Sequence, residues 1–256
     1  MKNLTPAERL IVAADFKPNP TKGENRNWAR RRVLMLADEL SGTGVCLKMN
    51  SILRACGYHL IKEVHDRGLR VLADLKLYDI GETLSTDGML LKEFKPELLT
   101  VACIAGVPAM QALKTELPDT EVLGVTVLTN TKDGNEPSDA QAMFVCSTAD
   151  AVLRFAKLAG YAGINGLISS AKEAEMLRAK FGVAMTINTP AIRPVWAVVS
   201  GDDHDPERIM TPTKAIMAGA DRIIVGEPIV KAGKPRDAVM RTIDEIASAI
   251  SALSAA

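Results

Sequence analysis

The sequence predicts an α/β fold, a (β/α)8 or TIM barrel formed by a single domain that spans residues 1–256. Short apolar runs rich in β-branched residues alternate with longer amphipathic segments along the chain, which is typical of βα units around a parallel sheet. A chain of 256 residues with a hydrophobic fraction of 47% can also bury one large core. No break in composition and no internal repeat marks a domain boundary.

The apolar runs predict eight strands, and each is followed by a segment with helical spacing. Eight such units close a barrel, whereas seven or nine would favour an open sheet. Plausible helix starts are Asn50-Ser51, Ser138-Asp139 and Thr211-Pro212. The predicted strands cover residues 10–15, 44–49, 70–77, 98–103, 121–128, 166–169, 184–188 and 222–225, and two of the longer predicted helices cover residues 50–67 and 139–158.

Composition argues against several classes of protein. Thirty-one basic and 31 acidic residues give a formal net charge of zero, so no global field would attract nucleic acid or a membrane surface. The basic run from Arg30 to Arg32 fits a solvated helix face better than a docking patch. There is no signal-like or membrane-spanning apolar segment, and the four cysteines and three histidines show no metal-ligand spacing. We therefore expect a cytoplasmic protein with no metal site.

Two stretches resemble long loops. Residues 130–138 are rich in asparagine, aspartate, glycine and proline, and residues 194–206 have Ser200-Gly201-Asp202-Asp203 at their centre. The two stretches follow the predicted fifth and seventh strands. In a barrel, loops at this end of the strands surround the active site, so both stretches are candidate lids. His204 lies in the second stretch, where a contact with substrate is one alternative and a purely structural role is the other.

Charged residues stand at the carboxyl ends of otherwise apolar strands. Asp15 follows the first run, Lys48 lies near the end of the second, and Asp74 and Lys76 lie near the end of the third. Burying such groups costs free energy unless they pair with one another or perform chemistry. Opposite charges brought together in a cavity can hold each other ionised. The pattern thus predicts a catalytic charge network, although a salt-bridge cluster that only fills the barrel remains an alternative.

The spacing of these charges predicts where they point. Asp74 and Lys76 are two residues apart, so on a regular strand they share the face toward the barrel axis, while their apolar neighbours face the helices. Asp79 has an odd offset from Lys76 and should lie where the strand has become loop. From there its side chain could reach a subunit interface.

A candidate phosphate site lies at the other end of the chain. The seventh run leads into Pro190 and Arg193, and the eighth leads into Gly226. Barrels commonly bind phosphate after these two strands through backbone amides. Gly226 would let a phosphate approach the backbone, but a glycine required only by the turn explains the residue equally well.

Six segments in the same order together resemble the orotidine 5′-phosphate decarboxylase family. The resemblance covers nearly the whole chain and implies conversion of orotidine 5′-phosphate to uridine 5′-phosphate without a metal or organic cofactor. The segments are Ile11-Val12-Ala13-Ala14-Asp15, Leu47-Lys48, Asp74-x-Lys76-x-x-Asp79-Ile80, Thr189-Pro190-Ala191-Ile192-Arg193-Pro194, Arg208-Ile209-Met210-Thr211-Pro212 and Ile224-Val225-Gly226.

The resemblance also implies roles for single residues. Asp74 and Lys76 would face the substrate carboxylate and the carbon that bears it, and Lys76 would deliver the proton after carbon dioxide leaves. Lys48 and Asp15 would complete the charge array and contact the ribose.

Three further residues take roles from the same resemblance. Asp79, as a catalytic residue, and Thr83 would come from the partner subunit of a homodimer. Thr129 stands where the family contacts the pyrimidine ring, although a capping or turn role is the alternative.

The chain departs from the family at the phosphate site. Glu227 follows Gly226 where the family usually has an arginine, and a carboxylate repels phosphate. Either Arg193, Lys231 or Lys234 supplies the cation, or backbone amides hold the phosphate alone, or the substrate differs. Ala191 and Gly81-Glu82 are smaller departures.

Related sugar-phosphate enzymes place a magnesium-binding glutamate on the second strand, so Lys48 argues against that branch. The remaining alternatives are a related barrel decarboxylase that acts on another acid and a catalytically silent barrel that binds a nucleotide.

Overall fold

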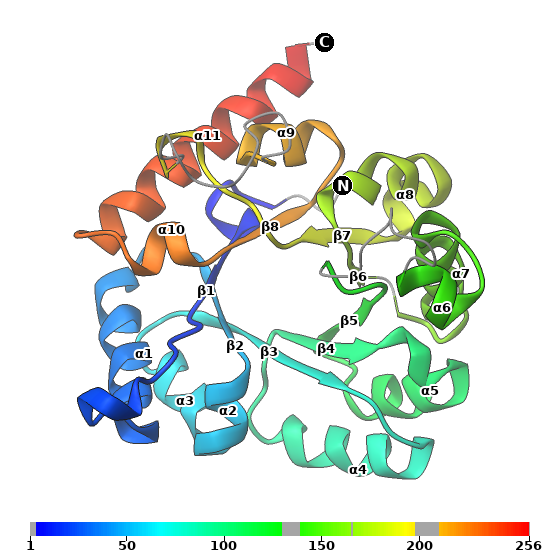
Figure 1. The fold of residues 1–256 in the computed structure, drawn as a ribbon, viewed down its shortest axis with the longest axis horizontal. Helices are drawn as coiled ribbons and strands as arrows, with labels where there is room; N and C mark the ends of the chain where they lie inside the picture. The colour runs from blue at the N-terminus through cyan, green and yellow to red at the C-terminus, as the bar shows by residue number, and fades with distance from the viewer. Residues whose placement is uncertain (1–3, 130–138, 165, 198–209, 256) are drawn as a thin grey trace.

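The computed structural model describes residues 4–129, 139–164, 166–197 and 210–255, and it confirms the predicted (β/α)8 barrel. The parallel strands β1 to β8 follow one another around a closed barrel, and β8 pairs with β1 to complete it (Figure 1). The strands are β1 (Leu10–Ala13), β2 (Cys46–Met49), β3 (Arg70–Leu77), β4 (Leu98–Ala102), β5 (Glu121–Val125), β6 (Gly166–Ile168), β7 (Thr186–Thr189) and β8 (Arg222–Val225).

Helices form a layer around the outside of this ring of strands (Figure 1). The α-helices are α1 (Arg26–Leu40), α2 (Ser51–Cys56), α3 (His59–His65), α4 (Gly81–Lys92), α5 (Val107–Glu116), α6 (Asp139–Phe144), α7 (Thr148–Tyr161), α8 (Ala174–Phe181), α9 (Pro212–Met217), α10 (Glu227–Val230) and α11 (Pro235–Ala255). Short 3₁₀ helices are η1 (Ala7–Arg9), η2 (Pro20–Lys22), η3 (Cys103–Ala105), η4 (Ala171–Glu173), η5 (Gly182–Ala184) and η6 (Val195–Ala197). Among the described helices, none combines the length and apolar character that crossing a bilayer requires.

The predicted helices differ from the observed ones in two places. The segment 50–67 divides into α2 and α3 at Gly57, whose positive φ of 83° ends the first helix. The segment 139–158 divides into α6 and α7, and Ser147 caps the second helix by accepting a hydrogen bond from the backbone N–H of Asp150 at 3.1 Å. The predicted caps at Asn50 and Thr211 are confirmed, whereas Ser138 lies outside the described residues.

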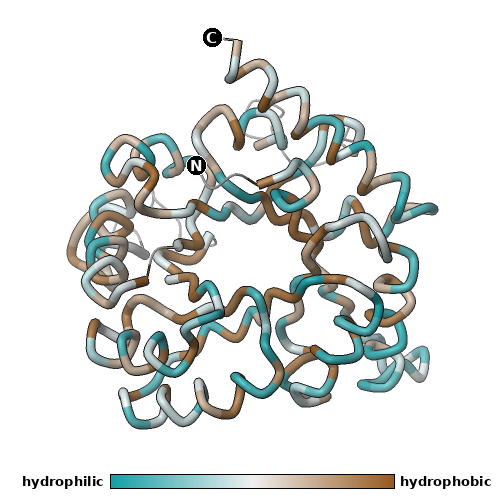
Figure 2. Tube along the Cα trace, turned by 180° about the vertical axis from the view of Figure 1, so that it is seen from behind, coloured by the Kyte–Doolittle hydropathy of each residue, from teal (hydrophilic) through white to brown (hydrophobic). Residues whose placement is uncertain are grey.

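The barrel interior changes from apolar to charged along its axis. A small cluster inside the barrel includes Cys46 on β2 and Leu72 on β3, and it is separate from the larger apolar layer between strands and helices. Side chains two residues further along each strand face the same way, and these are Lys48 and Asp74. The small apolar cluster therefore fills the barrel interior directly below the charged groups. In Figure 2, hydrophobic stretches recur in the central strands and hydrophilic ones lie mostly on the peripheral helices.

A different set of charges closes the amino end of the barrel. Arg222 on β8, which is 4% exposed, places Nη2 at 2.9 Å from Oε2 of Glu121 on β5. Arg222 also donates to Asn188 on β7, and Thr186 donates to Glu121. These contacts join β5, β7 and β8 at the end of the barrel away from Lys48 and Asp74. At this amino end, the polar groups of a TIM barrel serve stability rather than catalysis.

Candidate active site

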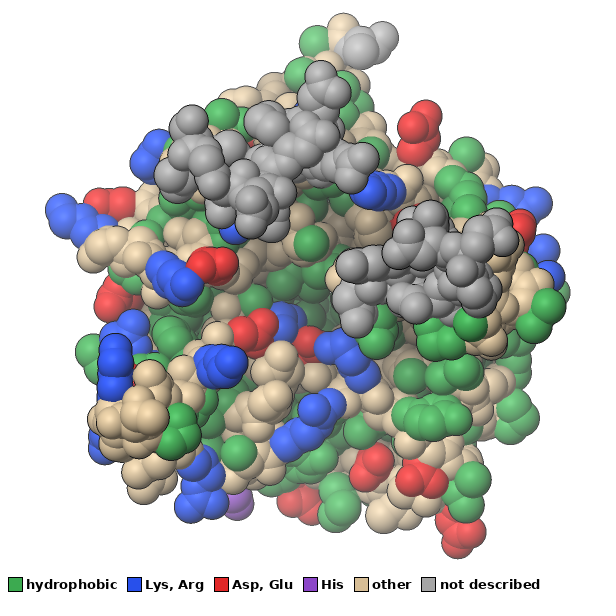
Figure 3. Space-filling model, viewed as in Figure 1, with side chains coloured by type: hydrophobic (Ala, Val, Ile, Leu, Met, Phe, Trp, Pro, Cys, Tyr) green, Lys and Arg blue, Asp and Glu red, His purple; other side chains and the backbone are tan. Residues whose placement is uncertain are grey.

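Four charged side chains of alternating sign meet at the carboxyl ends of β1, β2 and β3. Lys48 Nζ lies 2.8 Å from Asp15 Oδ2 and 3.2 Å from Asp74 Oδ2. Lys76 Nζ lies 2.7 Å from Asp74 Oδ1. The array thus runs Asp15, Lys48, Asp74, Lys76, and acidic and basic side chains lie next to one another near the centre of the face in Figure 3. The structure thus brings together the four residues of the predicted charge network.

Thr100 on β4 bonds to two residues of this array, and it is not among the site residues predicted from the sequence. The ladder between β3 and β4 shifts register between Ala73 and Leu77, so a regular alternation does not run through this part of β3. Lys76 lies inside the irregularity with a φ of 47°, a strained conformation for a residue with a side chain. The Thr100 hydroxyl accepts the backbone N–H of Lys76 at 2.8 Å and lies 3.0 Å from Asp74 Oδ1, to which it donates. Thr100 therefore provides a hydrogen-bond acceptor for the backbone N–H of Lys76 within the irregular part of β3.

The surroundings of Asp74 keep its carboxylate ionised. Burial disfavours the charged form, but attraction to Lys48 and Lys76 and hydrogen bonds from Lys76 and Thr100 outweigh it and hold the pKa of Asp74 below its usual value. Asp74 is 6% exposed and Lys48 is 7% exposed, so bulk water screens their attraction only weakly. A fixed carboxylate between two ammonium groups is the result.

The array forms one wall of a cavity of about 200 Å³. The rest of its lining is mostly apolar and comes from the ends of β5, β6, β7 and β8. The volume lies below the roughly 300 to 1,000 Å³ of a typical small-molecule site, so the cavity suits one ring rather than a whole nucleotide. The lining residues are Lys48, Asn50, Asp74, Lys76, Val125, Val127, Leu128, Thr129, Ile168, Ser169, Pro190 and Ile224, and they include the predicted Thr129 and Pro190.

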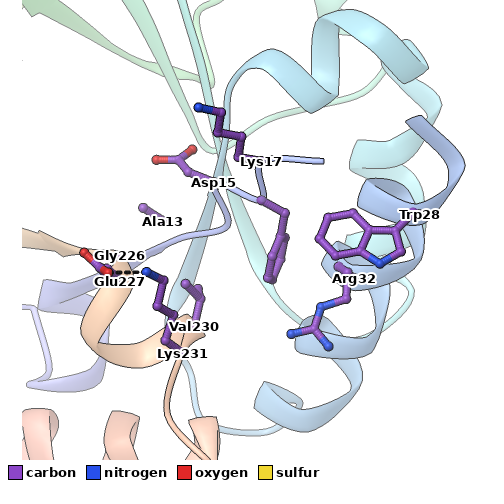
Figure 4. A pocket seen from close by; sticks show the side chains of 10 residues that line it. Ala13, Asp15, Lys17, Trp28, Arg32, Gly226, Glu227, Val230 and Lys231 are labelled. Carbon is purple, nitrogen blue, oxygen red and sulfur yellow. Dashed lines mark hydrogen bonds and ion pairs between the residues drawn. The ribbon is translucent and has the colours of Figure 1, made fainter. Parts of the chain in front are cut away.

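Figure 4 shows a second cavity, which has a volume of about 640 Å³. Asp15 lines it and is bonded to Lys48, which lines the first cavity, so the two spaces adjoin at this ion pair. Its lining residues are Ala13, Asp15, Phe16, Lys17, Trp28, Arg32, Gly226, Glu227, Val230 and Lys231. Three of these are cations, and the Arg32 guanidinium lies 5.2 Å from the centre of the Phe16 ring.

Glu227 is bonded to cations rather than standing alone in this second cavity. Its carboxylate forms an ion pair with Lys231, drawn in Figure 4, and its Oε2 lies 3.8 Å from Arg193 Nη2. Gly226 has a negative φ of −113°, so a left-handed turn does not explain the glycine there. The structure thus brings together the predicted residues Arg193, Gly226 and Glu227.

Asp79 and Thr83 lie apart from both cavities. Both are exposed, and Asp79 accepts a hydrogen bond from the backbone N–H of Ile80 at 2.7 Å. Burial and the nearby negative charge of Asp79 raise the pKa of Asp87 on α4. Within one chain these two predicted residues therefore do not join the array, and the lid stretches and His204 lie largely or wholly outside the described residues.

Fold and site together define a TIM-barrel enzyme with its chemistry at the carboxyl face of the strands. A family model described as "Orotidine 5'-phosphate decarboxylase / HUMPS family" matches residues 8–242, and the chain belongs to this family. A protein of Syntrophus aciditrophicus named orotidine 5′-phosphate decarboxylase is 33% identical, with 98% of this chain and 98% of that protein covered. One of the same name from Methylobacterium sp. is 35% identical over 96% of this chain and 98% of its own length.

Solved structures agree on the fold. The orotidine 5′-phosphate decarboxylase of Lactobacillus acidophilus superposes with a TM-score of 0.73 at 24% identity, with 93% of this chain and 99% of that chain covered. At this level of identity, the likeness is one of fold alone.

Proposed function

We propose that this chain is a carboxy-lyase that converts orotidine 5′-phosphate to uridine 5′-phosphate in pyrimidine biosynthesis. Family membership over nearly the whole chain supports the reaction. The observation that carries the chemistry is the Lys76 ammonium 2.7 Å from the Asp74 carboxylate, at the wall of a cavity large enough for a pyrimidine ring.

The array has the parts that this decarboxylation needs. The bond between the ring carbon and the carboxylate breaks, carbon dioxide leaves, and the electron pair stays on the ring carbon. Lys76 stabilises the developing carbanion and then transfers its proton to that carbon, after which solvent returns a proton to the amine. Asp74 pairs with Lys76 and is itself held by Lys48, so the array keeps the Lys76 side chain in place and little reorganisation is required. This scheme uses neither a metal nor an organic cofactor.

The two cavities divide the substrate between them. The smaller cavity takes the ring and its carboxylate, with Thr129 and Pro190 on the side away from the array. The Asp15–Lys48 pair at the junction contacts the ribose hydroxyls. The phosphate extends toward Gly226. There the Arg193 guanidinium lies close enough to Glu227 to offset part of its negative charge.

A homodimer would supply Asp79 and Thr83 to this site. Tyr78 and Ile80, on either side of Asp79, are 66% and 68% exposed, and Ile104 and Leu128 are more than half exposed. These residues follow β3, β4 and β5, which are neighbouring strands, so they lie along one edge of the carboxyl face. An apolar edge beside a carboxylate fits a second copy of the chain better than solvent. A cytoplasmic location stays a prediction from the sequence.

The direct test is the loss of orotidine 5′-phosphate absorbance on adding purified protein without metal, beside Lys76→Ala. We expect rapid loss with the wild type and a fall in turnover of at least about a thousandfold for Lys76→Ala, because the variant lacks the proton donor. The melting temperature should show that the variant is folded. Activity within a few-fold of the wild type would show that Lys76 is not the donor.

Glu227 supports one alternative, a decarboxylase for an acid without phosphate. Orotidine assayed beside orotidine 5′-phosphate separates the two, because a phosphate-independent enzyme would use both equally well. A shift in melting temperature with uridine 5′-phosphate but no product from either acid would instead indicate a silent nucleotide-binding barrel.

A further inference from the structure

Positive charge exceeds negative charge on the wall of the second cavity. Both carboxylates there already have a partner, because Asp15 pairs with Lys48 of the array and Glu227 pairs with Lys231. The two charged residues that remain are cations. The charged lining residues are Asp15, Lys17, Arg32, Glu227 and Lys231.

The two remaining cations are Arg32 and Lys17. Within the described part of the chain, neither of them forms an ion pair. Lys17 is exposed, whereas Arg32 is only partly exposed. A guanidinium that is partly out of water and has no carboxylate beside it is stabilised by an anion that enters the cavity. A phosphate monoester carries a charge of about −1.5 to −2 at pH 7, which matches these two cations.

Two aromatic rings hold Arg32 in place. Its guanidinium carbon lies over the Phe16 ring, 5.2 Å from the ring centre, and the Phe16 and Trp28 rings meet edge to face at a centroid distance of 6.4 Å. Trp28 and Arg32 are four residues apart on α1, so they share one face of that helix. In Figure 4, the Arg32 side chain extends from α1 toward the side of the cavity on which Lys231 lies. The rings thus restrict the guanidinium, and its planar set of N–H donors suits the oxygens of a phosphate.

Arg32 lies next to the place that the proposed function gives to the ribose. Phe16, which contacts the guanidinium, follows Asp15 directly in the chain, and Asp15 is bonded to Lys48 at the junction of the two cavities. When the pyrimidine ring fills the smaller cavity, the 5′-phosphate points away from it and into the larger one. The phosphate then meets an unpaired cation on the α1 side, whereas Lys231 on the other side is bonded to Glu227.

We propose that Arg32 is a specificity-determining residue that binds the substrate phosphate from the α1 side of the second cavity, and that Phe16 is a positioning residue that holds its guanidinium. Lys17 adds positive charge to the same site. This inference rests on the proposed function for the substrate and for the place of its ribose.

The first test measures by calorimetry how the wild type, Arg32→Gln and Arg31→Gln bind uridine 5′-phosphate and uridine, which lacks the phosphate. We expect Arg32→Gln to weaken binding of uridine 5′-phosphate at least about tenfold and to leave binding of uridine unchanged, because a charge-assisted contact with the phosphate is lost. Arg32→Lys should recover only part of the loss, because an ammonium group cannot donate two parallel hydrogen bonds to one phosphate.

Arg31→Gln is the matched control. Arg31 is exposed, precedes Arg32 on α1 and is not among the residues that line the cavity, so this variant removes the same charge from the same helix. It should bind both ligands as the wild type does. An Arg32→Gln protein that binds uridine 5′-phosphate as tightly as Arg31→Gln, or that loses uridine binding by the same factor, would overturn the contact with phosphate.

The second test asks whether Phe16 acts through Arg32. Phe16→Leu keeps an apolar side chain but removes the ring beneath the guanidinium, so it should weaken binding of uridine 5′-phosphate several-fold. In the Arg32→Gln background, Phe16→Leu should have no further effect. Additive effects of the two changes would show that Phe16 is only structural, and melting temperatures should show that each variant is folded.

These results separate the inference from the proposed function. A wild type that does not decarboxylate orotidine 5′-phosphate would refute the proposed function, while a preference for uridine 5′-phosphate that depends on Arg32 would still support the anion site. Decarboxylation by a wild type whose affinity for uridine 5′-phosphate does not depend on Arg32 would refute only this inference. Failure of the wild type to bind uridine 5′-phosphate would overturn both.

Discussion

At the scale of single residues, the charge at position 227 is the feature that most separates this chain from the pattern of its family. The Glu227 carboxylate is partly neutralised, because it pairs with Lys231 and lies near Arg193. Two effects on phosphate therefore oppose each other. The carboxylate repels the phosphate, but it also holds Arg193 beside the second cavity.

We expect Glu227→Arg to lower the Michaelis constant for orotidine 5′-phosphate about tenfold, since a charge-assisted hydrogen bond contributes about 1.5 to 3 kcal/mol. The rate at saturation should change little, because position 227 does not touch the array. Orotidine, which lacks the phosphate, is the control substrate. Glu227→Arg should leave its steady-state kinetic constants unchanged. A higher Michaelis constant for the phosphorylated substrate would show instead that Glu227 positions Arg193.

Some of the site residues could be predicted from the sequence and others could not. Asp15, Lys48, Asp74 and Lys76 were predictable because a charge at the end of an apolar strand is costly unless it pairs. Thr100 was missed because threonine occurs widely in strands and turns without a polar function. For Thr100, a lone hydroxyl within Leu98–Ala102 was the available signal, but the backbone irregularity that it satisfies has no signature in β3 itself.

At the scale of elements, the order and number of the strands were predictable, but the interruptions of the helices were not. Gly57 stops α2 through its backbone conformation, and the helical spacing of apolar residues continues on both sides of it. Ala191 is a second case, because its φ of 61° is a left-handed conformation that glycine adopts more readily. The sequence showed alanine where the family commonly has glycine, and the structure supplies the conformational reason.

Glu97 joins three elements at the amino end of the barrel. Its Oε2 lies 3.1 Å from Nε2 of His65 on α3 and accepts the backbone N–H of Val71 on β3 at 2.8 Å. Burial opposes ionisation of Glu97, but these hydrogen bonds and attraction to His65 outweigh it and hold its pKa below the usual value. A carboxyl group with a lowered folded-state pKa stabilises the fold above its unfolded pKa, and this stability is lost as the pH falls through the folded pKa.

We therefore expect Glu97→Gln to lower the melting temperature at pH 7 by about 2 °C, which corresponds to roughly 0.5 to 1 kcal/mol after allowing for the partial exposure of the side chain. The difference from the wild type should shrink as the pH falls below about 4, where the unfolded chain is protonated. Calorimetry measures the melting temperatures of both proteins between pH 7 and below about pH 4. Glu93→Gln, a change at an exposed position, is the control. A difference that does not depend on pH would mean that shape rather than charge explains the effect.

At the scale of the whole molecule, one chain does not bring all the predicted catalytic residues together. Asp79 is exposed on the segment after β3, although the network that it is predicted to join lies at the ends of β1, β2 and β3. The exposed Tyr78 and Ile80 beside it form an apolar edge with Ile104. A twofold dimer that buries this edge would carry Asp79 toward the site of the partner, because each subunit then gives and receives the same contact.

A mixture of two inactive variants tests this arrangement. In a dimer of Lys76→Ala with Asp79→Ala, the subunit that carries Asp79→Ala retains its own Lys76 and receives an intact Asp79 from its partner. One of the two sites is then complete. Random assortment makes half of the dimers mixed, so the refolded mixture should recover about a quarter of the wild-type activity per chain.

Each variant refolded alone is the control and should remain nearly inactive. No recovery in a mixture that sedimentation shows to be dimeric would place Asp79 in the site of its own subunit. Full activity of Asp79→Ala alone would remove it from the catalytic machinery, and a monomer at all concentrations that still turns over substrate would show that the four-residue array is sufficient.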